Sequence, residues 1–119
     1  MTPSTSPVFE LKTDAFKEQV IDNGTPILID FWAPWCGPCR MMKRHLDEAS
    51  KQLAGVARIA QVNVDEEPML ADAFGIQSIP TLVLLQDGKV IDAVRGVVPA
   101  DALVARIRER VLDVSPSKS

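Results

Sequence analysis

The 119-residue chain contains few cysteine, histidine and aromatic residues, and it has no tyrosine. Two cysteines are too few for the disulfide scaffold of a small secreted domain. Together with the single histidine they also fall short of the four ligands that a structural zinc site requires. Uninterrupted apolar runs reach only four or five residues, as at residues 82–85, whereas a membrane-spanning helix needs roughly 18. These absences argue against a cysteine-rich scaffold and a membrane protein.

A strong excess of charge of one sign is also absent. Thirteen Lys and Arg residues stand against sixteen Asp and Glu residues, which gives a formal net charge of −3. Because no net positive field results, nucleic acid and anionic membranes are not expected partners. Residues 1–7 show neither the basic nor the apolar segment of a signal or transit peptide, so we expect a cytoplasmic protein.

Hydrophobic residues make up 46% of the chain, enough for a packed core, and the length suits one domain. Both ends are polar and rich in Ser and Pro. We therefore expect a flexible extension over residues 1–7, a single domain over residues 8–113 and a flexible tail over residues 114–119. No long exposed apolar stripe is evident, which predicts a monomer.

The hydrophobic pattern predicts an α/β fold in which a central mixed sheet is flanked by about four helices, with a βαβ unit followed by a ββα unit. Asp87 and Gly88 separate two apolar segments and are typical of a tight hairpin turn. The expected elements are a helix over 14–21, a strand over 27–32, a helix over 38–54, a strand over 56–64, a helix over 68–74, strands over 81–86 and 89–95, and a helix from residue 99.

The most informative segment is WCGPC at residues 35–39. It places Cys36 where a buried strand meets the start of a helix, and free backbone amides and the helix dipole favour an anion there. A thiolate is such an anion, so the pKa of Cys36 is expected to be low. Cys39 lies one turn deeper and is better shielded. The two thiols are therefore expected to differ in reactivity.

Three interpretations of the cysteine pair compete. A purely structural disulfide that closes so short a loop would add only about 2 kcal/mol to the stability of the fold. A metal site would need His45, but His45 lies about 120° around the helix from Cys39, so it is predicted to be a surface or packing residue. Reversible dithiol–disulfide chemistry is the interpretation that we favour, and we expect no metal.

The segment DFWAPWCGPC at residues 30–39 is accompanied by VNVD at 62–65, SIPT at 78–81, a QDGK turn at 86–89 and Gly96. With these motifs, the span from about residue 8 to residue 112 resembles the thioredoxin family. WCGPC followed at this spacing by Ile79 and Pro80 is a very specific combination.

The resemblance implies that Cys36 attacks a target disulfide and that Cys39 then resolves the mixed disulfide, a reaction that requires two thiols. It also implies that Asp30 is a buried carboxyl beneath the pair, with a pKa raised by burial, that takes the proton of Cys39. The residues agree, because an unpaired carboxyl inside ILIDFW at residues 27–32 would cost several kcal/mol without a purpose.

Pro80 matches the cis-proline of the family, which leaves the backbone of Ile79 free to pair with a bound substrate strand. Trp32 is expected to serve as packing or support. The resemblance further implies a small, mostly apolar docking surface formed by Trp35, Gly37, Pro38, Ile76, Ile79, Pro80, Gly96 and Val97.

Several positions depart from the family pattern. Gln61 stands where relatives commonly have a lysine near the buried carboxyl, and Arg44 replaces a helix-kinking proline. Ser78 replaces a frequent glycine. We expect these changes to affect the fine adjustment of the cysteine chemistry and the choice of partner, and not the basic reaction. Met41 and Met42 are predicted to fill the core, and the arginines of the last helix are predicted to form a solvated face.

The function that these residues predict is protein disulfide reduction, with a redox-active Cys36–Cys39 disulfide and no bound cofactor. The resemblance implies disulfide-containing target proteins and re-reduction by an NADPH-dependent thioredoxin reductase. Two alternatives stay open. A thiol oxidase or isomerase would need a more oxidising disulfide, and Gly37 and Pro38 argue against it because oxidants of this family more often carry a His before the second Cys. A non-catalytic interaction subunit would use only the docking surface.

Overall fold

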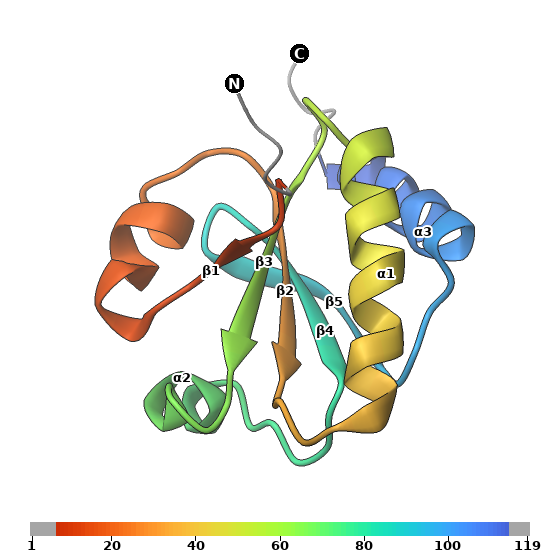
Figure 1. Ribbon diagram of the computed structural model, residues 1–119. Helices are drawn as coiled ribbons and strands as arrows, with labels where there is room; N and C mark the ends of the chain where they lie inside the picture. The colour runs from red at the N-terminus through yellow and green to blue at the C-terminus, as the bar shows by residue number, and fades with distance from the viewer. Residues whose placement is uncertain (1–6, 115–119) are drawn as a thin grey trace, which may run out of the picture.

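The central strand of the molecule is β2 (Ile27–Trp32), whose side chains are buried on both faces of a five-stranded sheet. The computed structural model describes residues 7–114 (Figure 1). The remaining elements are β1 (Phe9–Glu10), a 3₁₀ turn (Thr13–Ala15), a π-helical segment (Lys17–Ile21), α1 (Gly37–Gln52), β3 (Arg58–Asn63), α2 (Pro68–Ala73), β4 (Thr81–Gln86), β5 (Lys89–Arg95) and α3 (Ala100–Val114).

The strands follow the spatial order β1-β3-β2-β4-β5. The pairs β1–β3 and β2–β3 are parallel, whereas β4 runs antiparallel to both β2 and β5. Because α1 connects β2 to β3, the first half is a βαβ unit and the second half is a hairpin followed by α3. The predicted mixed α/β fold is confirmed. The hairpin turn is also confirmed, since Asp87 and Gly88 adopt positive φ angles of 55° and 76°, as such turns require.

Residues of β2 alternate between two hydrophobic layers. Leu28 packs in the layer under α1 and α3, whereas Ile27, Ile29 and Phe31 pack in the layer on the opposite face. Figure 1 shows α1 and α3 together on one side of the sheet, with α2 and the N-terminal helical segment on the other. By this alternation Asp30 faces α1, which is the helix that begins at the cysteine pair.

The structure corrects several sequence-based expectations. Strand β1 was not predicted, because two residues are too few to show an alternating pattern. Residues 14–21 form a 3₁₀ turn and a π-helical segment instead of a regular α-helix, and Val20 is the one residue of these two segments that is fully buried. Met42 lies in the core as predicted, but the prediction for Met41 was wrong, since 57% of that residue is exposed.

The expected extension and tail lie outside the described residues, apart from Pro7 and Val114. The predicted domain boundaries at residues 8 and 113 therefore stay predictions.

Arg106 and Arg108 are exposed as expected, yet each holds α3 in place. Arg106 forms an ion pair with Asp92 of β5, and Arg108 donates a hydrogen bond of 2.8 Å to the carbonyl of Gln52 at the end of α1.

Candidate functional site

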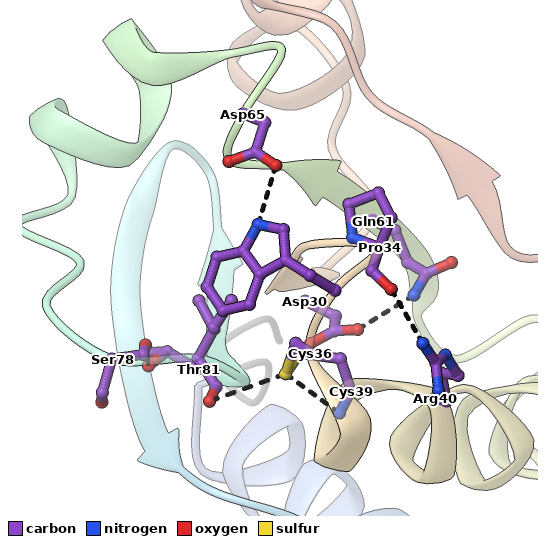
Figure 2. Close-up of a disulfide and its surroundings, with 11 residues drawn as sticks. Asp30, Pro34, Cys36, Cys39, Arg40, Gln61, Asp65, Ser78 and Thr81 are labelled. Atoms are coloured by element: carbon purple, nitrogen blue, oxygen red, sulfur yellow. Dashed lines mark hydrogen bonds between the residues drawn. A yellow bond between two sulfur atoms is a disulfide. The ribbon is translucent and has the colours of Figure 1, made fainter.

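Cys36 and Cys39 form a disulfide at the N-terminus of α1 (Figure 2). Cys36 caps the helix, and its Sγ accepts a hydrogen bond of 3.2 Å from the backbone amide of Cys39. Cys36 is 5% exposed and Cys39 is 1% exposed. The same amide and the helix dipole would stabilise a thiolate on Cys36 after reduction. The helix start therefore favours Cys36 as the attacking sulfur.

A loop from the opposite half of the chain lies against the disulfide. The carbonyl oxygen of Ile79 is 4.0 Å from Cys36 Sγ, and the peptide bond between Ile79 and Pro80 is cis. The carbonyl of Pro80 accepts a hydrogen bond of 2.8 Å from the amide of Gly96. The cis-proline loop thus brings Gly96, which follows β5, to the same end of the sheet as Cys36.

Asp30 is completely buried in the centre of the sheet. Its sheet neighbours are Gln61 on β3 and Leu82 on β4. Gln61 donates a hydrogen bond of 3.0 Å from Nε2 to Asp30 Oδ2, whereas Oδ1 has no hydrogen-bond partner among the described residues. Burial raises the pKa of Asp30 to about 6, and the Gln61 hydrogen bond and the charge of Lys43 offset part of that rise. A carboxyl in this state can accept a proton near neutral pH.

A shallow groove of about 190 Å³ lies next to the disulfide, since Ile79, which lines the groove, also packs against the cysteines. Trp35 is 67% exposed, while Ile76 and Ile79 are half-buried. A mostly apolar groove of this kind suits an extended peptide segment. The groove is lined by Trp35, Val64, Ala71, Ile76, Gln77, Ser78 and Ile79.

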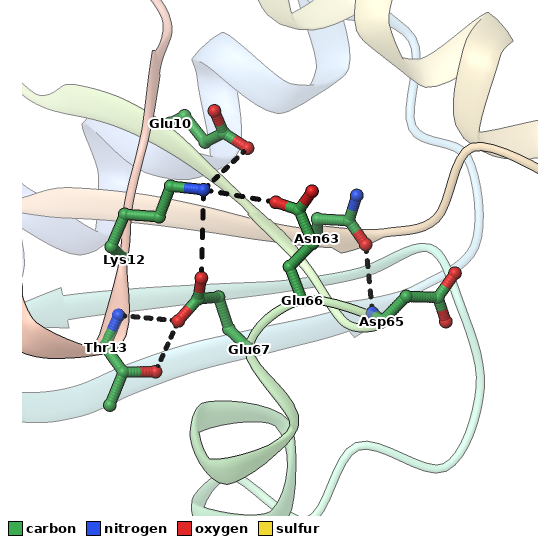
Figure 3. Close-up of polar contacts among 7 residues, drawn as sticks. All are labelled: Glu10, Lys12, Thr13, Asn63, Asp65, Glu66 and Glu67. Carbon is green, nitrogen blue, oxygen red and sulfur yellow. Dashed lines mark hydrogen bonds and ion pairs between the residues drawn. The ribbon is translucent and has the colours of Figure 1, made fainter.

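Trp35 is held in place by Asp65, whose Oδ2 accepts a hydrogen bond of 2.9 Å from the indole Nε1. Asp65 lies in the connection between β3 and α2, where its own amide bonds Asn63 Oδ1 at 2.9 Å. The same connection is tied to the N-terminal segment through Lys12, which forms ion pairs with Glu10, Glu66 and Glu67 (Figure 3). The role of Asp65 was not predicted from the sequence, although its place just after a buried strand is a usual one for a site residue.

The structure brings together most of the residues expected around the thiols. Gly37 and Pro38 are exposed in the first turn of α1, and Pro80 is buried next to Ile79, whose carbonyl faces Cys36. Val97 packs against the core layer under α1. Trp32 contacts the cysteine cluster, and its buried Nε1 has no hydrogen-bond partner among residues 7–114. This contact supports the role in packing that we expected for Trp32.

Comparison with known proteins agrees with this geometry. The family model for thioredoxin matches residues 7–109. Thioredoxin 1 of Synechococcus elongatus is 48% identical over 92 residues, covering 76% of this chain and 86% of the relative. Thioredoxin 1 of a Nostoc species is 45% identical over 94 residues, covering 79% and 88%. Thioredoxin of a Synechocystis species is 45% identical over 95 residues, covering 80% and 89%.

The chain belongs to the thioredoxin family. Family membership and the cysteine pair at the start of α1 make the protein a protein-disulfide oxidoreductase that works by dithiol–disulfide exchange. Within residues 7–114, no three or more His, Cys, Asp or Glu side chains gather as metal ligands do. None of the helices that the structure describes has the length and apolar content needed to cross a membrane.

Proposed function

We propose that the protein reduces disulfides of other proteins, with Cys36 attacking, Cys39 resolving and Asp30 accepting the proton of Cys39. The Cys36 thiolate attacks one sulfur of the target disulfide, forms a mixed disulfide and releases the other target sulfur as a thiolate. Cys39 then transfers its proton to Asp30 and attacks Cys36 Sγ, which restores the Cys36–Cys39 disulfide and releases the second target thiolate. Two electrons pass from the dithiol to the target.

The observation that carries these assignments is the asymmetry of the two sulfurs. Cys36 caps α1 and is the more exposed of the pair, beside Ile79 and the groove, whereas Cys39 is sealed in the first turn. An incoming disulfide therefore meets Cys36 first. Asp30 supports the second step because it is buried on the α1 face and has one carboxylate oxygen without a hydrogen-bond partner among the described residues.

The docking surface and the recycling partner belong to the same proposal. An extended segment of the target would lie in the groove beside Trp35 and pair with the backbone of Ile79. Membership of the thioredoxin family supports NADPH as the source of electrons, passed on by a flavoprotein thioredoxin reductase. The sequence itself has no G-x-G-x-x-G motif for a dinucleotide. The protein would act as a monomer in the cytoplasm, a compartment that keeps dithiols reduced.

Single cysteine variants test the order of attack. Cys39→Ser should accumulate a covalent mixed disulfide with a target protein, because the resolving thiol is missing. Cys36→Ser should form none and should lose disulfide reduction. Non-reducing gel electrophoresis after incubation with insulin distinguishes the two variants. Retention of reduction by Cys36→Ser would overturn the assignment.

The reduction potential of the Cys36–Cys39 pair tests the direction of the reaction. The protein is equilibrated in defined dithiothreitol buffers, and free thiols are trapped by alkylation. A potential below roughly −250 mV would support a reductase, and one above roughly −200 mV would favour a thiol oxidase or isomerase. In the second case Gln61 and Arg44 are the first residues to replace by the lysine and proline that are common in the family.

A further inference from the structure

The N-terminus of α3 lacks a cap from its own sequence. The first amides of a helix have no partner within the helix and are usually satisfied by a Ser, Thr, Asp or Asn side chain just before it. Here Val98 and Pro99 precede Ala100, and neither side chain has an acceptor atom. The Pro99 carbonyl accepts the first helical hydrogen bond, from Leu103, but this bond satisfies the amide of Leu103 and not the amides that start the helix.

The missing cap comes from another helix. His45 on α1 is half-buried, and its Nδ1 accepts a hydrogen bond of 3.2 Å from the backbone amide of Ala100. The imidazole can accept there only as the neutral ring with its proton on Nε2. Three residues earlier on α1, Met42 Sδ lies 3.4 Å from the amide of Val98 and accepts its hydrogen bond. Two side chains of α1 therefore hold the segment between β5 and α3.

This segment is continuous with the active site. It begins at Gly96, whose amide bonds the carbonyl of Pro80, and the neighbouring carbonyl of Ile79 is 4.0 Å from Cys36 Sγ. Cys36 in turn starts α1, which carries the two acceptors. The contacts close a ring from the disulfide through the cis-proline loop and residues 96–100 back to the same helix.

We propose that His45 is a positioning residue for protein substrates, because it caps α3 and thereby holds Gly96 and Val97 in the segment that the Pro80 carbonyl ties to the Cys36 end of the sheet. It does not touch the reacting sulfurs. The inference rests on the docking role proposed above for Gly96 and Val97. The substrate class that it affects is a disulfide within a polypeptide, since a small disulfide has no chain to lie against this segment.

Three variants isolate the hydrogen bond. His45→Asn keeps an acceptor, because Asn Oδ1 is bonded to Cγ as His Nδ1 is. His45→Leu removes the acceptor but keeps an apolar side chain. Arg44→Leu makes a similar change at the adjacent exposed position and serves as the matched control. Thermal unfolding of each variant shows whether the fold is retained.

The direct readout is amide hydrogen exchange of Ala100 followed by NMR. His45→Leu should exchange about three- to tenfold faster at Ala100, in line with the loss of one hydrogen bond. His45→Asn and Arg44→Leu should stay within twofold of the unmodified protein. Unchanged protection of Ala100 in His45→Leu, or equal loss in His45→Asn, would overturn the cap.

The functional readout compares insulin with hydroxyethyl disulfide. His45→Leu should raise KM for insulin about three- to tenfold, with kcat and the rate on the small disulfide unchanged. An equal loss on both substrates would show a general structural effect and would overturn the positioning role. Val97→Asp tests the docking proposal separately. If Val97→Asp leaves KM for insulin unchanged, the docking role fails, and exchange at Ala100 then decides the cap by itself.

Discussion

The centre and the edge of the sheet each hold an aspartate, and the two carboxyls have opposite surroundings. Asp30 on central β2 is fully buried and accepts one hydrogen bond, from the neutral amide of Gln61. Asp92 on edge strand β5 is bound by the guanidinium of Arg106 through both oxygens and lies near Arg110. Burial raises the pKa of Asp30 to about 6, whereas the Arg106 hydrogen bonds lower the pKa of Asp92.

The difference separates a carboxyl that stabilises the fold from one that is available for chemistry. The ion pair at Asp92 satisfies the charged form and fastens α3 to the sheet. At Asp30 only one of the two carboxylate oxygens accepts a hydrogen bond within the described residues, so ionisation there lowers the stability of the fold. This loss of stability is what the proposed role of Asp30 as a proton acceptor, beside the helix that starts at Cys36, would require.

Replacing Asp30 by Asn should produce the largest effect. The variant removes the buried charge, and a shift from 3.8 to about 6 corresponds to about 3 kcal/mol. Since the new amide nitrogen lacks a partner, which costs about 1 to 3 kcal/mol, we expect a net gain of at most about 2 kcal/mol in the free energy of unfolding at pH 7. Reduction of insulin should slow by roughly 10²-fold because Cys39 loses its proton acceptor. Urea unfolding and insulin turnover measure the two effects.

The matched control is Asp92→Asn, which changes the same chemical group at the edge of the sheet. It should lower the stability slightly and leave turnover unchanged, because Asp92 lies in the ion pair with α3 and not in the proposed proton path. If Asp30→Asn lowered stability, or if both variants slowed turnover equally, the contrast between centre and edge would be wrong.

The pH dependence of stability provides a second test of the same contrast. The folded pKa of Asp30, about 6, is raised above its ordinary value of 3.8. The loss of folding stability caused by the ionised Asp30 is therefore fully present above pH 6. It shrinks as pH falls from about 6 to about 4 and is absent below that. The disulfide form should gain up to about 3 kcal/mol over this window relative to Asp30→Asn. Equal pH profiles for the two proteins would contradict the raised pKa.

Local signals in the sequence identified much of the fold. Three signals each lie within the element that they predict, so neighbouring residues suffice to recognise it. They are the run ILIDFW, the proline near the start of α1 and the Asp87–Gly88 turn. Strand β1 was missed because it exists only through its pairing with β3. Residues 14–21 were expected to be a regular helix; they form a 3₁₀ turn and a π-helical segment, of which Val20 packs in the layer on the β2 face opposite α1.

The site was less predictable because its contacts join distant segments. The cysteine pair and the buried Asp30 follow from motif and pattern. The bond between Gln61 and Asp30 depends on the register of β2 and β3, which no local sequence signal reveals. The groove combines Trp35 with residues 64–79, and His45 meets Ala100 only after α1 and α3 pack together. The prediction for Met41 was wrong because the buried stripe of α1 is narrow: it includes Met42 but not the adjacent Met41.

A smaller effect is expected for Gln61→Met, which keeps the side-chain length but removes the donor to Asp30. The hydrogen bond from Gln61 favours the ionised carboxyl, so its loss should raise the pKa of Asp30 by about one unit, equal to about 1.4 kcal/mol. The ¹³C shift of the Asp30 carboxyl followed by NMR over pH 4–9 reports the change. Gln61→Glu is the control, since a second carboxylate should raise the pKa further. An unchanged pKa in Gln61→Met would show that the amide does not stabilise the charge.

The smallest effect is expected at the edge, for Arg106→Leu. Arg106 is partly exposed, with 43% of its side chain accessible, so solvent and salt screen its attraction to Asp92. Its loss should cost at most about 1 kcal/mol in the free energy of unfolding at pH 7. The cost should decline as pH falls through the lowered pKa of Asp92, because the pair stabilises only the ionised carboxyl. As pH falls, protonation of Asp92 removes a stabilising ion pair, whereas protonation of Asp30 removes a destabilising buried charge. Urea unfolding of Arg106→Leu and the unmodified protein at pH 7 and pH 3 therefore separates the two carboxyls. A cost that stayed the same at pH 3 would mean that Arg106 acts through packing and that the edge carboxyl is not the stabilising partner.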